Sequence, residues 1–253
     1  MCLVLSRYRE NYFFKEAQMG LYIILMGVQG SGKGTQAAYI TQNYGGIPQI
    51  STGDLFRALK NRTDDFAKQI QQTMAEGKLI GDDTTNKMVE ERLKEPDAAN
   101  GAIFDGFPRT PYQAQWLETY LATKGEKIAA VVLMKIDLYN AFRRAFGRIT
   151  SAGGEGYNIY TDADKLDYKW IDHPEKLFPP RLEVTVKSTG EKLVRRPDDA
   201  SADAIIKRID IFQKTTQPLI DYFSGKGLVH DLNADQSVEA VSAEIKRILD
   251  AAK

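Results

Sequence analysis

Four glycines and a lysine are concentrated in the segment GVQGSGKGTQ, residues 27–36. Gly27, Gly32 and Lys33 fit the phosphate-loop spacing G-x-x-x-x-G-K, and the apolar run LYIILM precedes them as a strand would. Glycines let successive backbone N–H groups point inward, so that they surround phosphate oxygens together with the N-terminus of the next helix. A plain strand-to-helix turn would not require a lysine here. The segment therefore predicts binding of a nucleotide's phosphates.

This motif indicates a ligand and not a reaction, because motors, GTPases and kinases all share it. Gly34 and then Thr35 follow the lysine, where a serine or threonine is usual. The motif therefore does not by itself predict direct contact between a hydroxyl group and Mg²⁺.

Arginines in several separate segments indicate the reaction. Transfer of a phosphoryl group between two nucleotides brings two anionic chains together, and the protein has to supply positioning and positive charge. A guanidinium group can grip two phosphate oxygens at once. The candidates are Arg57, Arg109, Arg144, Arg148, Arg196 and Arg208. Arg144 and Arg148 also have a spacing that suits a solvent-exposed helix face.

The elements that must position these residues alternate between strand and helix. Apolar runs bounded by turn residues predict buried parallel strands. They cover residues 22–26, 47–50, 102–105, 129–136 and 227–232. Helical patterns lie between them, and three of these start near residues 82, 110 and 238. The pattern predicts an α/β fold of the P-loop type, with three layers and a central parallel five-stranded sheet.

Two segments interrupt this alternation. Residues 51–80 contain only polar helical sequence and predict a small helical insert, whereas residues 149–195 are rich in turn signals and predict a small β-rich insert. The core domain is then expected to comprise residues 19–50, 81–148 and 196–253. Because phosphoryl transfer requires exclusion of water, the two inserts are candidate lids.

At this point the chain closely resembles the adenylate kinases of the nucleoside monophosphate kinase family. GVQGSGKGTQ, STGDLFR (51–57) and DGFPRTPYQ (105–113) occur in that family's order, and the resemblance covers residues 19–253. The lysine–glycine–threonine order looks like the family's own form of the loop. The resemblance implies reversible transfer, MgATP + AMP giving two ADP, directly and in line, with Mg²⁺ as cofactor. It also implies that the helical insert binds the monophosphate and that the β-rich insert is a lid.

The resemblance assigns roles to individual residues. The residues implied to bind AMP are Thr52, Arg57, Lys78, Leu79, Ile80, Gly106, Phe107, Pro108, Arg109, Gln113, Arg196 and Arg208. Those implied to bind ATP are Gly30, Ser31, Gly32, Lys33, Gly34, Thr35, Arg144, Arg148, Tyr157 and Gln236. The implied catalytic residues are Lys33, Arg109, Arg148, Arg196 and Arg208. Asp54 and Asp105 would orient the water shell of Mg²⁺, and Gln113 would hydrogen-bond adenine.

Some of these assignments involve a choice. Arg195 and Arg196 are adjacent, and Arg196 is preferred because RPDD resembles the family's R-x-D-D pattern. Asp198 and Asp199 would either bind arginines of the lid or cap a helix. His230, in a predicted buried strand, is expected to be packed and not catalytic.

The second insert departs from the family pattern. Many adenylate kinases bind zinc there through cysteines, but Cys2 is the only cysteine of this chain, so no zinc site is expected. Residues 160–177 look like extra sequence. Trp170, Tyr160 and Tyr168 are expected to form a small aromatic core in place of zinc. A lone His173 beside surface acids is typical of a solvated loop and not of a metal site.

Composition excludes some classes of protein. The chain has 253 residues, with 34 basic against 34 acidic, so no global charge favours nucleic acid or a membrane surface. No apolar run approaches a membrane span. Residues 1–18 are expected to be a non-native or disordered extension, with Met19 as the initiator. A cytoplasmic monomer is the expectation.

The sequence leaves two alternative functions open. Another nucleoside monophosphate kinase would use GTP as donor, or UMP or CMP as acceptor. The long second insert, with Thr52 and Gln113, favours adenine. A P-loop ATPase acting on a macromolecular partner would need no acceptor pocket, so STGDLFR and DGFPRT argue against it.

Overall fold

The computed structural model describes residues 19–59, 62–75, 80–175, 180–196, 199 and 201–252. Three of the expectations above therefore lie outside the described residues. They concern the extension at 1–18, the side chains of Lys78 and Leu79, and Asp198.

A parallel five-stranded sheet forms the centre, as the sequence predicts, with the strand order β10-β4-β1-β3-β2. The strands are β1 (Leu21–Met26), β2 (Gln49–Ser51), β3 (Gly101–Asp105), β4 (Ile128–Lys135) and β10 (Val229–Asn233). In the register, Leu25 of β1 lies beside Asp105 of β3. Because the strands are parallel, the loop after β1 and the end of β3 meet at one edge of the sheet.

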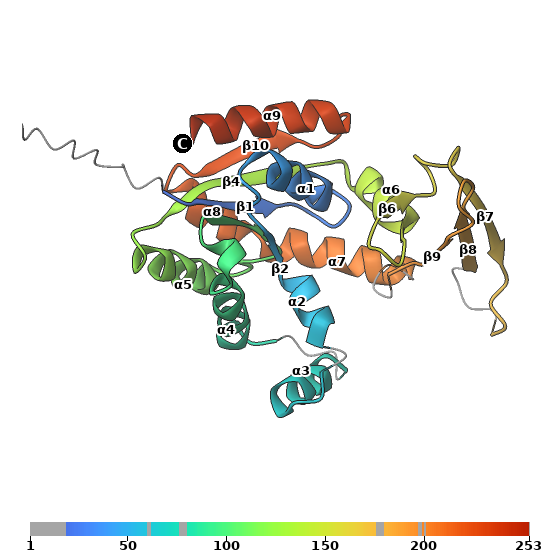
Figure 1. Cartoon of the computed structure of the whole chain (residues 1–253), viewed down its shortest axis with the longest axis horizontal. Helices are drawn as coiled ribbons and strands as arrows, with labels where there is room; N and C mark the ends of the chain where they lie inside the picture. The colour runs from blue at the N-terminus through green and yellow to red at the C-terminus, as the bar shows by residue number, and fades with distance from the viewer. Residues whose placement is uncertain are drawn as a thin grey trace, which may run out of the picture.

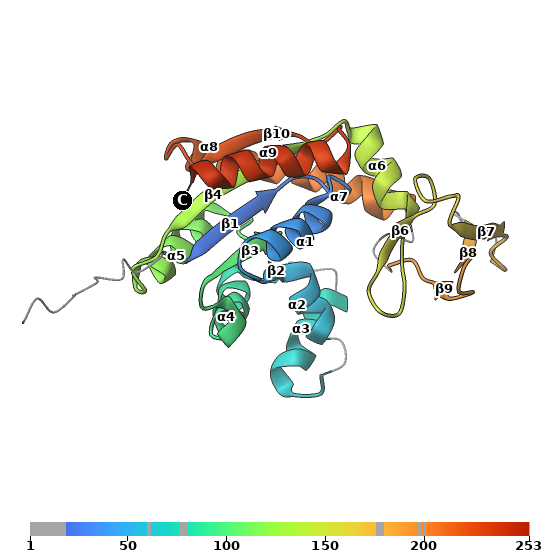
Figure 2. The same ribbon diagram turned by 45° about the horizontal axis from the view of Figure 1, so that its top comes forward.

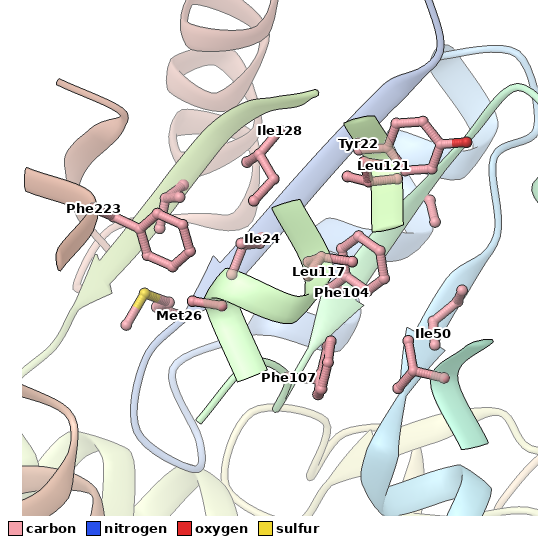
Figure 3. Close-up of a cluster of buried hydrophobic side chains, with 14 of the residues drawn as sticks. Tyr22, Ile24, Met26, Ile50, Phe104, Phe107, Leu117, Leu121, Ile128 and Phe223 are labelled. Atoms are coloured by element: carbon pink, nitrogen blue, oxygen red, sulfur yellow. The ribbon is translucent and has the colours of Figure 1, made fainter. Parts of the chain in front are cut away.

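Helices cover both faces of this sheet, which gives three layers (Figures 1 and 2). Ile23 and Leu25 face the side of α1 (Lys33–Asn43) and α9 (Val238–Ala251). Alternate residues of β1 face the other side, and Figure 3 shows Tyr22, Ile24 and Met26 there with aromatic and aliphatic partners. That layer contains α4 (Asp82–Leu93), α5 (Pro111–Ala122) and α8 (Gln217–Ser224), and the short helix Pro96–Ala98 follows α4. Burial on both faces explains why the three inner strands β1, β3 and β4 are largely apolar, whereas the edge strands β2 and β10 carry polar residues.

Side-chain caps fix where several helices begin. The Thr110 hydroxyl accepts from the backbone N–H of Gln113 at 3.2 Å, and Pro111 occupies the first turn of α5. The Asp137 carboxylate accepts from Asn140 N at 3.0 Å and so starts α6 (Leu138–Gly147). Each cap satisfies an N–H that has no partner inside its helix. These caps set the rotation of the two helices that carry Gln113 and Arg144.

The segment predicted as a helical insert contains α2 (Thr52–Ala58) and α3 (Asp65–Ala75). Leu59, Ala67 and Ile70 are buried together in a small core of their own. Figures 1 and 2 show α3 projecting away from the central sheet. This region therefore has a small core of its own, while Leu55 of α2 packs against the main core.

The second insert contains two small antiparallel sheets. They are formed by β5 (Arg148–Thr150) with β6 (Gly156–Asn158), and by β7 (Leu166–Ile171), β8 (Arg181–Val186) and β9 (Lys192–Leu193). A bridge between Thr150 and Val194 joins them. The chain then returns to the core through α7 (Ala202–Thr215), which packs on α6 (Figure 1).

The expected aromatic core of this insert is wrong. Its buried residues are aliphatic, namely Ile149, Ile159, Leu166, Val184, Val186 and Leu193. Tyr160, Tyr168 and Trp170 are 45%, 44% and 39% exposed. The register explains the difference, since Leu166 pairs with Val186 inside the cluster while Trp170 lies farther along β7. Trp170 instead stacks on Phe146 of α6, with ring centroids 6.0 Å apart.

Among the described residues, no helix is both long and apolar enough to cross a bilayer. His230 is half-buried in β10, the edge strand.

Candidate active site

The glycine-rich loop curls tightly between β1 and α1. Gly30 and Gly32 adopt left-handed φ values of 87° and 95°. A Cβ at Gly30 would lie 2.1 Å from the carbonyl oxygen of Ala141 in α6, so only glycine fits there. The Lys33 ammonium group donates to the carbonyl oxygens of Gly27 at 2.8 Å and Val28 at 3.1 Å. The lysine thus folds back over the loop that precedes it.

The Ser31 hydroxyl is an unused hydrogen-bonding group in this loop. Ser31 is 1% exposed, and its oxygen has no hydrogen-bond partner among the described residues. Buried polar groups are nearly always paired, so an orphan marks a place where a ligand can supply the partner. The outer loop residues Gly34 and Thr35 are exposed at the start of α1.

Asp105 lies at the end of β3, beside this loop. Its carboxylate is 3.9 Å from the Lys33 nitrogen and accepts from the Gln49 side chain at 3.0 Å. The arrangement follows from the sheet, because β2 and β1 are the two neighbours of β3. A lysine and a fixed carboxylate therefore face each other across the loop.

Three arginines act electrostatically on Lys33. Burial lowers the pKa of Lys33, Asp105 opposes this, and the charges of Arg148, Arg109 and Arg208 lower it further. The pKa of Arg109 is likewise lowered, first by loss of hydration and then by Arg208. Cations that depress one another's pKa values lie close together without enough protein anions to neutralise them. The site is therefore short of negative charge.

Asp199 is the buried hub of this cluster. It is 0% exposed, and one carboxylate oxygen accepts from Nε and Nη2 of Arg148 at 2.8 and 2.5 Å. The other oxygen accepts from Arg208 at 3.4 Å and from the side-chain amide of Gln29. Of the two roles considered for Asp199, arginine binding is observed, although Arg148 and Arg208 lie just outside the insert expected to form the lid. Helix capping is wrong, because Ser201 caps α7.

Arg195 and Arg196 face different surroundings. Burial lowers the pKa of Arg196, and the charges of Arg148 and Arg57 lower it further, which places it with the arginine cluster. The Arg195 guanidinium lies 4.2 Å from the ring centroid of Phe146 and donates to the Phe146 carbonyl oxygen. Arg196 therefore belongs to the arginine cluster, whereas Arg195 packs on Phe146.

The residues expected to bind the acceptor gather around Gly106, which has a φ of 71°. Its carbonyl oxygen accepts from the Thr52 hydroxyl at 2.8 Å and from Arg109 Nε at 2.9 Å. Arg57 donates to Asp54 at 2.6 Å. Two segments of the chain, α2 and the turn after β3, thus meet at the carboxyl ends of the strands.

Gln113 is engaged with protein groups in this structure. It is 4% exposed, accepts from the backbone N–H of Arg109 at 2.7 Å and donates to Asp82 at 2.8 Å. Its expected hydrogen bond to adenine stays a prediction and would require exchange of one of these bonds. The Phe107 side chain belongs to the apolar core, where Pro108 is also buried. Ile80 is half-buried against the small core of α2 and α3.

Residues expected to contact the donor base lie on the other side of the loop. Arg144 of α6 donates to the carbonyl oxygen of Ala234 at 2.9 Å. Gln236 follows two residues later and donates to Asn233 at 2.9 Å. Tyr157 of β6 packs against the aliphatic core of the second insert. Arg144 therefore lies beside the loop after β10, as a shared base pocket requires.

Asp54 and Asp105, the two residues expected to orient the water shell of Mg²⁺, carry side chains that suit this ion, which prefers oxygen ligands and retains several waters. Burial would raise the pKa of Asp54, but the Arg57 hydrogen bond and charge outweigh this and lower it. Asp105 is held by Gln49 and faces Lys33. Both positions supply the hard oxygen donors that the ion requires.

Sequence reasoning missed Gln29. It occupies a variable position of the motif, so the motif alone gives no signal for its side chain. Its contact with Asp199 spans 170 residues of sequence, which no local pattern reports.

Within the described ranges, no group of three or more histidine, cysteine or acidic side chains could hold a metal ion. The aliphatic core of the second insert provides its stability instead. We therefore expect a strong chelator to leave the melting temperature unchanged, as measured by thermal unfolding. A fall in Tm that added zinc reverses would contradict this expectation.

Comparisons with known proteins agree with this geometry. A sequence model of the family described as adenylate kinase matches residues 25–228. The adenylate kinase of Rhizobium etli is 38% identical over 227 residues, which cover 90% of this chain and 98% of the relative. That of Listeria monocytogenes is 37% identical over 229 residues, with the same two shares. That of Nitrosococcus oceani is 35% identical over 231 residues, covering 91% and 99%.

Proposed function

Because the chain belongs to the adenylate kinase family, a family of nucleoside monophosphate phosphotransferases, we propose a direct in-line mechanism with defined residue roles. The γ-phosphoryl group of MgATP passes to AMP, which gives two ADP without a phosphoenzyme. ATP phosphates occupy the glycine-rich loop and AMP occupies the pocket around Gly106.

One observation supports this assignment most strongly, namely the convergence of cations beside the loop. The charges of Arg109, Arg148 and Arg208 lower the pKa of Lys33, and the charge of Arg208 lowers that of Arg109. These residues come from α1, the loop between β3 and α5, the start of β5 and α7. A site with this excess of positive charge is suited to two polyphosphates that meet end to end.

Each part of the site has a task in the proposed mechanism. Backbone N–H groups of the loop and the Lys33 ammonium group bind the donor's phosphates. Arg109 and Thr52 orient the acceptor phosphate, so that its oxygen faces the γ-phosphorus in line. Arg148, Arg196 and Arg208 neutralise charge that develops on the transferring group. No proton has to leave the acceptor, because a phosphate oxygen is already anionic.

Mg²⁺ would be held through phosphates and water, with Asp54 and Asp105 orienting that water. When bound, the ion shields phosphate charge as a Lewis acid. Asp105 would hold its water while Gln49 keeps the carboxylate in place. Asp54 would do the same from α2.

The two inserts act as lids in this proposal. Residues 51–80 close over AMP, and residues 149–195 close over ATP. Closure brings Arg196 toward the phosphates and excludes water, which prevents hydrolysis of the donor. We further propose that the protein acts as a cytoplasmic monomer.

A coupled assay with each nucleotide pair tests the proposed substrates. ATP with AMP should give the highest kcat/KM, because the long second insert and the presence of both Thr52 and Gln113 favour adenine. Higher turnover with UMP or CMP, or with GTP as donor, would favour another nucleoside monophosphate kinase. Hydrolysis of ATP that does not depend on an acceptor would contradict the transfer mechanism.

A further inference from the structure

We propose that Gln29 is a positioning residue for phosphoryl transfer, an inference that rests on the proposed function. Its side-chain amide donates to Asp199, and Asp199 in turn holds Arg148 and Arg208. Gln29 thus connects the glycine-rich loop, which binds the donor, to the arginines that act on the transferring group.

The chemistry of the amide fixes its orientation. The Asp199 carboxylate can only accept hydrogen bonds when ionised, so it must face the Nε2 end of Gln29. The other end, Oε1, is buried and has no hydrogen-bond partner among the described residues. The contact with Asp199 is therefore the bond that orients this side chain.

Gln29 differs from the other partners of Asp199 in charge. Arg148 and Arg208 are drawn toward phosphate when nucleotides bind, because a guanidinium group pairs well with either anion. A neutral amide is not attracted in the same way. Gln29 can therefore keep Asp199 in place while the two arginines share their hydrogen bonds with phosphate.

The burial of Asp199 makes this support important. The carboxylate is 0% exposed, so water cannot replace a lost partner. Without Gln29, the side-chain partners that remain for this carboxylate among the described residues are Arg148 and Arg208, the arginines that it has to position. Arg148 and Arg208 would then sample more orientations, and misplaced charge lowers the rate of the chemical step.

The test is the substitution Gln29→Leu, which removes the donor and keeps a similar volume. Misplaced arginines affect the transition state more than ground-state binding, so kcat should fall about tenfold, with the KM values for ATP and AMP within about twofold of the unmutated enzyme. A rise in the KM for ATP of about tenfold with kcat unchanged would overturn the proposal, because it would indicate loss of loop structure alone.

Gln36→Leu is the matched control. This glutamine lies in the same segment but bonds to Val238 at 3.4 Å and Ser242 at 3.0 Å, at the contact between α1 and α9. The control should lower Tm and keep kcat. Loss of kcat in both variants in proportion to Tm would overturn the proposal.

A double-mutant cycle with Asp199→Asn identifies the path of the effect. Gln29→Leu should lower kcat by less than about twofold in the Asp199→Asn background, because a neutral amide no longer anchors Arg148 and Arg208 by charge, and Gln29 then has no arginine orientation left to support. A full effect in both backgrounds would contradict action through Asp199. If Asp199→Asn does not fold, the separation of kcat from KM in Gln29→Leu alone decides. An unmutated enzyme that fails to convert ATP and AMP would instead refute the proposed function.

Discussion

Replacing Lys33 with methionine is expected to lower kcat by roughly a thousandfold. The substitution removes a preorganised cation that stabilises the negative charge of the transferring phosphoryl group. The Lys33 ammonium group is held beside the loop by hydrogen bonds to the carbonyl oxygens of Gly27 and Val28, and its third N–H remains to bind phosphate. Steady-state kinetics with ATP and AMP provide the measurement.

The same substitution should not destabilise the fold. Burial and three neighbouring arginines lower the pKa of Lys33, so its charge is unfavourable in the folded protein without nucleotide. We expect the Tm of Lys33→Met to equal or exceed that of the unmutated protein. A variant that loses activity and also melts several degrees lower would contradict this explanation.

Arg109→Ala is expected to have an effect of similar size, about a thousandfold on kcat. The Arg109 side chain donates to the Gly106 carbonyl oxygen at 2.9 Å, and its backbone is fixed by Gln113 at 2.7 Å. The guanidinium fork is therefore held in place before substrate binds. Arg109→Lys should recover little, because an ammonium group cannot grip two oxygens.

Arg92→Ala is the matched control for this arginine. Arg92, in the last turn of α4, makes two 2.7 Å hydrogen bonds to Asp97 of the short helix Pro96–Ala98 and has no role in the proposed site. The control should retain the full kcat. A near-normal rate for Arg109→Ala, or an equal loss in both variants, would contradict the role given to Arg109.

The central architecture could be predicted from the sequence because its signals are local. Strands buried on both faces are largely apolar. Pro111 and the acidic residues Asp82 and Asp83 mark the N-termini of α5 and α4. The five-stranded parallel sheet is confirmed. The glycine-rich loop follows β1 as its motif requires, because that motif encodes a backbone shape.

The core of the second insert and the contacts of the arginine cluster could not be predicted, because they depend on tertiary contacts that local sequence patterns do not report. The aliphatic core of the second insert arises from the register of β7 on β8, which the sequence leaves open. Trp170 therefore stacks on α6 and not within its own insert. Asp199 and Gln29 meet across most of the chain. The preference for Arg196 comes from the RPDD pattern, but the contact of Arg195 with Phe146 depends on tertiary packing that the sequence does not report.

The most direct test is a crystal structure of the protein with a dinucleotide that joins two adenosines through a polyphosphate chain. We predict that the side chains of Lys33, Arg109, Arg148, Arg196 and Arg208 lie within hydrogen-bond distance of that chain, with Asp199 still bound to Gln29. If those side chains point into solvent while the dinucleotide is bound, the proposed mechanism is wrong.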